Sequence, residues 1–178
     1  MIGKGVTKTR VVVAYQPCEK RLNRKGFTVF EQHERYFEPR GDFRSPRTIF
    51  LEQLVSQLLL WKASGEEIIL FGDFNEHVYT CRLAKRLEDG DLLMQEQYRA
   101  YTGKQLPATF LRGPRPIDGV FATTGVTVRN AGLLRRRGGV GDHRCFILDF
   151  ESLSVFGNTF PQVLPPNTRK LNCEFLAQ

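Results

Sequence analysis

Two polar residues follow directly on one of the most apolar stretches of the chain. Residues 68–77 read IILFGDFNEH, which sets Asp73 and Asn75 two apart after a glycine. In an extended segment such residues point to the same side, so their side chains can converge on one ligand. Carboxylate and amide oxygens suit a hard cation, and a carboxylate can accept the proton of an attacking water. Gly, Asp and Asn also favour turns, so this stretch by itself fits a turn as well as a catalytic corner.

Asp142 and His143 form a second polar pair, in the sequence GDHR that precedes the apolar run 145–150. In a turn that leads into a strand, both side chains can reach the same cleft. The alternative is a capped turn with a solvated histidine. The chain has only three histidines, and His77 also follows an acidic residue, Glu76, which adds some weight to a functional role.

Asp118 lies in PIDGVFAT, residues 116–123, an otherwise apolar segment that reads as a strand. A buried aspartate without a partner is costly. A histidine ring nitrogen is a suitable partner, because the carboxylate fixes the tautomer of the ring and keeps it protonated. An aspartate on an edge strand that faces water is the alternative. Tyr15 ends the apolar run VVVAY and is, taken alone, a core or rim tyrosine.

The chain is basic, with a net charge of +7, and this favours polyanionic partners such as nucleic acid or phosphorylated ligands. Arg135, Arg136 and Arg137 form a basic run shortly before Asp142. A run of like charge is commonly a solvated surface. Its place beside the suspected site makes phosphate contact a candidate role for these three residues.

Composition indicates a globular protein. The 178 residues are 41% hydrophobic, which is enough for one domain with a core. No apolar stretch approaches the length of a membrane span, and the N-terminal sequence contains no cleavage-like site. The four cysteines form no CxxC pair and have no histidines at zinc-finger spacing. We therefore expect an intracellular protein, cytoplasmic or nuclear, that is neither secreted nor membrane-bound.

The candidate residues lie at the ends of predicted strands. Apolar and β-branched runs predict strands at 10–14, 67–71, 108–110, 116–123, 126–133 and 145–150, the first two of them buried. A helix is predicted from Pro46, with Ser45 as its cap, to Gly65. Leu83, Ala84 and Leu87 predict a shorter helix that ends near Gly90. Residues 16–45 are polar and read as a long loop.

The order of these elements predicts an α+β fold. The strand pattern fades after Phe150 into a segment rich in Pro and Asn. We therefore predict a domain at residues 1–151 and a tail or linker at 152–178.

The motifs VVVAYQP, ILFGDFN, PIDGVFAT and GDH, in this order, resemble the endonuclease/exonuclease/phosphatase superfamily, also called DNase I-like. The resemblance covers about residues 8–151. A fainter similarity links residues 33–54 to retroelement-like (retrotransposon) open reading frames. The resemblance implies a four-layer sandwich of two mixed sheets with helices outside and an active site at one end of the sheets. It also implies hydrolysis of phosphodiesters or phosphomonoesters by water, dependent on Mg²⁺ or Mn²⁺.

The family's catalytic roles carry over onto five residues. Asp73 would orient or deprotonate the attacking water, and Asn75 would hold that water and the phosphate oxygens. His143 would neutralise a non-bridging phosphate oxygen, with Asp118 orienting its ring. Tyr15 would contact the phosphate or the leaving oxygen. These roles agree with the chemistry of the residue types, since a cationic imidazole offsets transition-state charge and a carboxylate activates water.

The resemblance places Asp142 at or near the metal and implies that part of the domain is missing. In the family, two earlier strands carry an asparagine and a metal-binding glutamate, whereas only fourteen residues precede Tyr15 here and MIGKGVTKTR has neither. Gly141 replaces a common serine. We expect either a fragment of a longer gene, such as a degenerate retroelement, or a short protein without metal-dependent activity.

Three functional hypotheses result. The first is an N-terminally truncated, metal-dependent phosphodiester hydrolase of endonuclease type that acts on nucleic acid. The second is a catalytically inactive remnant that binds nucleic acid. The third is a relative of inositol or lipid phosphatases. The basic composition and the arginine run favour nucleic acid over a lipid headgroup.

Overall fold

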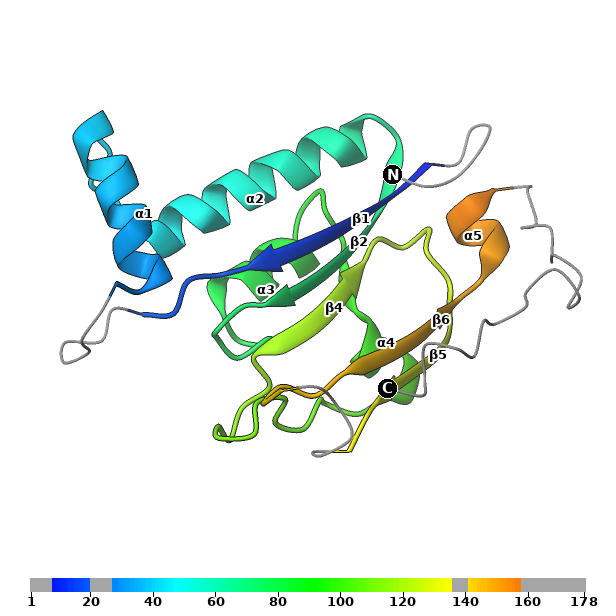
Figure 1. Cartoon of the computed structure of the whole chain (residues 1–178). Helices are drawn as coiled ribbons and strands as arrows, with labels where there is room; N and C mark the ends of the chain where they lie inside the picture. The colour runs from blue at the N-terminus through cyan, green and yellow to red at the C-terminus, as the bar shows by residue number, and fades with distance from the viewer. Residues whose placement is uncertain (1–7, 20–26, 136–140, 158–178) are drawn as a thin grey trace, which may run out of the picture.

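The computed structural model describes residues 8–19, 27–135 and 141–157 (Figure 1). Within these residues the strands are β1 (Lys8–Tyr15), β2 (Glu66–Asp73), β3 (Gln95–Glu96), β4 (Asp118–Ala122), β5 (Val128–Leu133) and β6 (Phe146–Phe150). The helices are α1 (Val29–Phe37), the 3₁₀ helix η1 (Glu38–Arg40), α2 (Pro46–Ala63), α3 (Arg82–Glu88), α4 (Gln97–Thr102) and α5 (Ser152–Phe156). None of these described helices is long and apolar enough to cross a membrane.

The described strands form two sheets. The first has the order β1-β2-β4-β3, in which β1 and β2 are parallel and the other pairs are antiparallel; the second is the antiparallel pair β5-β6. Figure 1 shows α2 beside β1 and β2, with β5 and β6 on the far side of β4. The α+β class with two sheets is confirmed, and the arrangement is compatible with the predicted sandwich.

Alternating side chains of β2 build the two halves of the core. Ile68 and Leu70 face α2 and α3, where they pack with Leu58 and other buried residues. Ile69 points to the opposite face and packs with Val120 beneath the second sheet and α5. Because side chains alternate along a strand, this apolar run can fill both layers at once.

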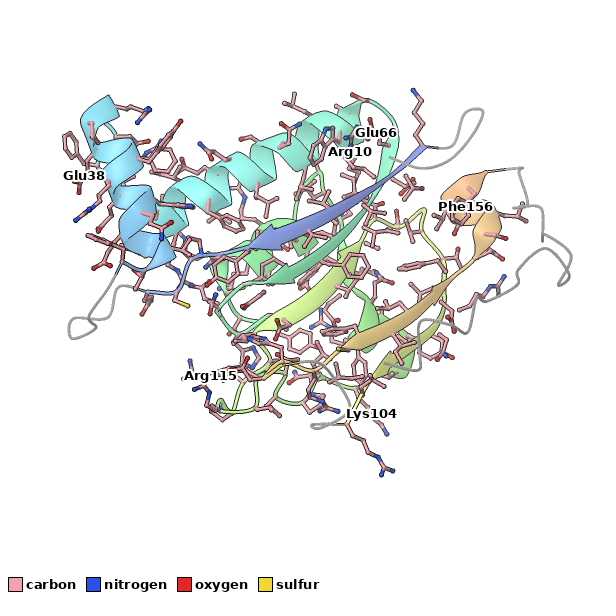
Figure 2. All side chains as sticks on the ribbon, viewed as in Figure 1. Arg10, Glu38, Glu66, Lys104, Arg115 and Phe156 are labelled. Atoms are coloured by element: carbon pink, nitrogen blue, oxygen red, sulfur yellow. The ribbon has the colours of Figure 1, made fainter. Side chains whose placement is uncertain are left out.

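An ion pair fixes the start of the β1–β2 register. The Arg10 guanidinium donates to both carboxylate oxygens of Glu66, at 2.5 and 2.8 Å, and lies 4.4 Å from the Trp61 ring centroid (Figure 2). From this end the parallel pairing continues to Tyr15 opposite Asp73. The register therefore brings two of the candidate residues together at the other end of the strands.

Several predicted elements are confirmed, and three need correction. Helix α2 begins after Ser45, whose Oγ accepts from the Arg47 backbone N–H, and ends before Gly65 as predicted. The predicted loop 16–45 is wrong in part, since it contains α1 and η1. The predicted strand 108–110 is wrong, since Phe110 makes only an isolated bridge.

The third correction concerns the burial of β1. Val11 and Val13 are 46% and 81% exposed, although the prediction for residues 10–14 was a buried strand. These side chains lie on the face that the second sheet covers over β2 and β4. At β1 this cover consists of α5, where the Thr9 hydroxyl donates to the Val155 carbonyl at 2.9 Å.

The predicted domain boundary at residue 151 falls directly before α5. Val155 of this helix is 2% exposed and belongs to the core beneath the second sheet. The packed part of the chain therefore continues through α5. Residues 158–178 of the predicted tail lie outside the described residues.

Candidate active site

Sheet register places three of the candidate residues in one row. Tyr15 of β1 pairs with Asp73 of β2, and Asp73 pairs with Asp118 of β4. Directly paired residues on neighbouring strands point to the same face of a sheet. The row lies on the face that carries Ile69 and Val120 further along the strands, so it stands at one end of the space between the sheets.

An antiparallel bridge brings His143 to this row. Phe110 pairs with His143, and the Arg144 backbone N–H donates to the Thr109 carbonyl at 2.8 Å. His143 Nδ1 then lies 2.9 and 3.0 Å from the two carboxylate oxygens of Asp118. Because a carboxylate only accepts, Nδ1 carries the proton, and Nε2 is left for a ligand. Asp118 has the histidine partner that its sequence position suggested, on a central strand.

The turn after β2 carries two of the candidate residues, Asp73 and Asn75. The Asn75 backbone N–H donates to Asp73 Oδ1 at 3.0 Å, and Asn75 has a φ of 49°, which asparagine tolerates well. Its side-chain amide donates to the Gln16 carbonyl at 2.7 Å. The Cys18 thiol donates to Asn75 Oδ1 at 3.1 Å. The two residues therefore lie in a turn, and the turn keeps them next to each other.

Gly72 gives this corner its shape. A Cβ at Gly72 would lie 2.4 and 2.5 Å from atoms of the Phe74 ring. That ring is 1% exposed and packs in the core on the α2 side. The glycine therefore makes room for a core phenyl between the two polar residues, while Asp73 and Asn75 remain at the surface.

The surroundings of Asp73 and His143 shift the pKa of both groups upward. Burial raises the pKa of Asp73, and the nearby Asp118 carboxylate adds to this, against the Asn75 N–H and His143. Burial by itself lowers the pKa of His143, but the Asp118 hydrogen bond and the charges of Asp118, Asp73 and Asp142 outweigh it and raise the pKa overall. The imidazole is thus biased to its cationic form, and Asp73 is a better proton acceptor than an exposed aspartate.

Asp142 lies on the other side of the imidazole. Its Oδ1 is 4.0 Å from His143 Nε2, and its Oδ2 accepts from the Arg112 guanidinium at 2.6 Å. The Arg112 hydrogen bond lowers the pKa of Asp142. Arg135 is exposed after the end of β5. Arg136 and Arg137 lie outside the described residues.

A cavity of about 740 Å³ lies beside the candidate residues. Tyr15, Asp73, Asn75 and His143 line one side of it. The residues around the start of α1 form an apolar wall that includes Phe27, Val29 and Phe30. Cys18 and Arg112 also line the cavity, and the sequence interpretation had not singled out either of them or the apolar wall.

The polar side of the cavity fits a divalent cation. Ligand atoms of Asp73, Asp118 and His143 lie within 4.8 Å of one another, the one such group in the described part of the chain. Asp118 and His143 are bonded to each other, so Asp73 is the member of this group whose carboxylate lines the cavity. Mg²⁺ is commonly held by one or two carboxylates plus water and phosphate oxygens. Asp73 offers such an oxygen at the cavity, whereas Asp142 is not among the residues that line it.

No protein-family model and no curated protein matches the chain. Among solved structures, the catalytic domain of human Nocturnin with a bound sulfate anion is similar, with a TM-score of 0.46 and 21% sequence identity. The match covers 57% of this chain and 40% of that chain. The chain therefore spans less than half the length of that catalytic domain.

Proposed function

We propose that this chain is a metal-dependent phosphodiester hydrolase of nuclease type, from the endonuclease/exonuclease/phosphatase superfamily that its motifs resemble. The observation that carries the proposal is the row of Tyr15, Asp73 and Asp118, with His143 bonded to Asp118, at one cavity. A general base and a cationic hydrogen-bond donor face the same space. Both groups accelerate phosphoester hydrolysis, the first by activating water and the second by stabilising transition-state charge.

Asp73 is the base in this proposal. Its partly buried carboxylate is held by the Asn75 backbone N–H on one oxygen, which leaves the other oxygen to take a proton from water. The raised pKa of Asp73 makes its carboxylate a stronger base than an exposed aspartate. Asn75 is fixed by Gln16 and Cys18, so it positions Asp73 at little entropic cost.

His143 is the cationic donor. Asp118 holds Nδ1, so Nε2–H is directed toward a ligand and can donate to a non-bridging phosphate oxygen. Asp118 does not line the cavity and acts through the imidazole, as a positioning residue. Burial and the Cys18 hydrogen bond raise the pKa of Tyr15, so its phenol stays protonated and can donate to a second phosphate oxygen.

Asp73 and Asp142 would hold the divalent cation. Mg²⁺ or Mn²⁺, when bound, offsets phosphate charge and makes a coordinated water more acidic. Asp142 must then exchange its Arg112 partner for the cation, and both side chains are exposed enough for this exchange. Arg112 would be released toward the substrate phosphates.

Nucleic acid is the proposed substrate, because the chain has a net charge of +7 and Arg112 stands at the cavity. One observation favours an inactive nucleic-acid-binding protein as the second candidate. The carboxylate assigned to the metal, Asp142, already has a cationic partner in Arg112 at 2.6 Å.

A substrate panel separates the hypotheses. The purified chain is incubated with plasmid DNA, single-stranded DNA, RNA and inositol phosphates, with Mg²⁺, with Mn²⁺ or with EDTA. We expect cleavage of nucleic acid that requires the cation. Binding of nucleic acid without cleavage under every condition would instead support the inactive protein. Release of phosphate from inositol phosphates without nucleic-acid cleavage would overturn the choice of substrate.

A further inference from the structure

We propose that the apolar wall of the cavity is a nucleobase site in which Phe27 is the stacking ring, so the substrate is single-stranded nucleic acid. This inference rests on the proposed function and specifies its substrate. The cavity has a polar side for a phosphate and an apolar side formed by Phe27, Val29 and Phe30. A nucleotide has the same division between its phosphate and its base.

Phe27 is a large apolar side chain that the protein leaves in contact with solvent. It is 62% exposed, and its neighbour Val29 is 38% exposed, although both line the cavity. Phe30, one residue further, is 8% exposed and anchors the same segment in the protein. An aromatic ring that is exposed inside a cavity, on an anchored segment, offers its apolar surface to a ligand.

The backbone beside Phe27 is fixed by the start of α1. Thr28 and Glu31 form a capping box, in which the Thr28 N–H donates to Glu31 Oε2 at 2.9 Å and the Glu31 N–H donates to Thr28 Oγ1 at 3.3 Å. The ring is therefore carried by an ordered helix start. Because the ring is already ordered, stacking of a ligand on it costs little conformational entropy of the protein.

Arg35 orients the Phe27 ring itself. The guanidinium carbon lies 3.7 Å from the ring centroid, in a cation–π contact from the last turn of α1. This contact occupies one face of the ring and leaves the other for a ligand. A cation on the far face also makes the site more favourable for a ligand that carries phosphates.

Phe110, another aromatic residue that lines the cavity, is already engaged. Phe110 lies 5.0 Å from the His143 ring and 5.3 Å from the Arg112 guanidinium carbon. It supports the phosphate side, whereas Phe27 has an open face. Stacking on one aromatic ring requires a base that is not stacked in a duplex, and every base has such a face. An inositol ring has no π-face and would leave this wall without a partner.

The test is equilibrium binding in EDTA, so that no cleavage occurs. Fluorescence anisotropy measures the affinity of the full chain for a labelled single-stranded oligonucleotide and for the same backbone with abasic residues. We expect Phe27→Ala to weaken binding of the base-bearing strand by roughly 5- to 150-fold, the range of one base–aromatic stack. Binding of the abasic strand should change by less than about twofold, because the phosphate contacts stay intact.

Two further variants make the comparison sharp. Phe27→Trp keeps a stacking ring and should bind the base-bearing strand at least as well as the wild type. Phe43→Ala removes another exposed phenylalanine, 81% exposed and outside the cavity lining, and should bind like the wild type. Equal losses on the two strands with Phe27→Ala would overturn the base site. Equal losses with duplex and single-stranded DNA would overturn the single-strand assignment.

Cleavage assays keep this inference separate from the proposed function. If the wild type cleaves no nucleic acid but Phe27→Ala loses base-dependent binding, the hydrolase function is contradicted. The base site is supported in that case. Cation-dependent cleavage that is as strong on single strands in Phe27→Ala as in the wild type would contradict the base site and leave hydrolysis standing.

Discussion

At the residue scale, the candidate site depends on Asp118, a carboxylate that does not line the cavity. Asp118 holds His143 Nδ1 at 2.9 and 3.0 Å, while the Thr109 hydroxyl accepts from the Asp118 backbone N–H at 3.1 Å. The imidazole therefore has a fixed tautomer and a fixed orientation before any ligand arrives. The raised pKa of His143 follows in part from this arrangement.

The pH dependence of His143 tests that arrangement. The Asp118 carboxylate raises the pKa of His143, so Asp118→Asn should lower it, and an NMR titration without added metal would measure this change. In the proposed mechanism the cationic imidazole is the active form, so activity should fall as the pH rises through this pKa. The alkaline limb of the pH–activity profile should therefore move to lower pH in Asp118→Asn.

The control for this experiment is Asp149→Asn on β6. Asp149 is an exposed aspartate bonded to Asn130 rather than to a histidine. Its substitution should leave the His143 titration unchanged. An unchanged His143 titration in Asp118→Asn would contradict the assigned role of Asp118.

The sequence predicted the polar residues of the site better than its apolar ones. Tyr15, Asp73, Asp118 and His143 lie at or near strand ends, so an ordered set of strands brings them together. Phe27 was not predicted, because its place at the cavity depends on the path of the segment before α2. Local sequence carries no signal for that path.

At the element scale, β2 and the turn after it need Gly72. The Phe74 ring occupies the space where a Cβ would lie, at 2.4 Å. We expect Gly72→Ala to destabilise the fold by about 1–3 kcal/mol, the usual cost of overpacking a core, in urea unfolding.

Gly132→Ala is the matched control on β5, since a Cβ there meets nothing within 4 Å. It should be neutral or slightly stabilising, because alanine reduces the entropy of the unfolded chain. If Gly72→Ala were as stable as Gly132→Ala, the Phe74 packing around the candidate site would be wrong.

The start of helix α1 has a sequence signal that the prediction from composition did not use. Residues 28–31 read TVFE, which is the spacing of a capping box, and the structure forms both of its hydrogen bonds. The segment was predicted as a loop because it is polar and has no long apolar stripe. A search for helix starts would have placed α1, although not its position over the cavity.

At the scale of the whole molecule, the described sheet ends at β1 with apolar side chains in solvent. Val11 and Val13 are exposed on one face, and β1 has no strand on its outer side among the described residues. An exposed apolar edge strand favours association between chains. The protein should therefore self-associate or be poorly soluble at high concentration.

Val13→Lys should reduce that association, because a charge on an edge strand opposes pairing with another chain. Light scattering coupled to size exclusion, over a range of concentrations, measures the change in mass. Leu60→Lys on α2 is the control, since Leu60 is 63% exposed but lies on a helix. A monodisperse monomer in the wild type at all concentrations would contradict this interpretation of β1.

The central claim is tested most directly by cation-dependent cleavage of a single-stranded oligonucleotide by the wild type, Asp73→Asn and His143→Gln. Removing either the base or the cationic donor should lower the rate roughly a hundredfold or more, while Asp149→Asn stays at the wild-type rate. Thermal melts of all four proteins confirm that they are folded. Wild-type cleavage that survives in both Asp73→Asn and His143→Gln, or the absence of cation-dependent cleavage in the wild type, would contradict the account.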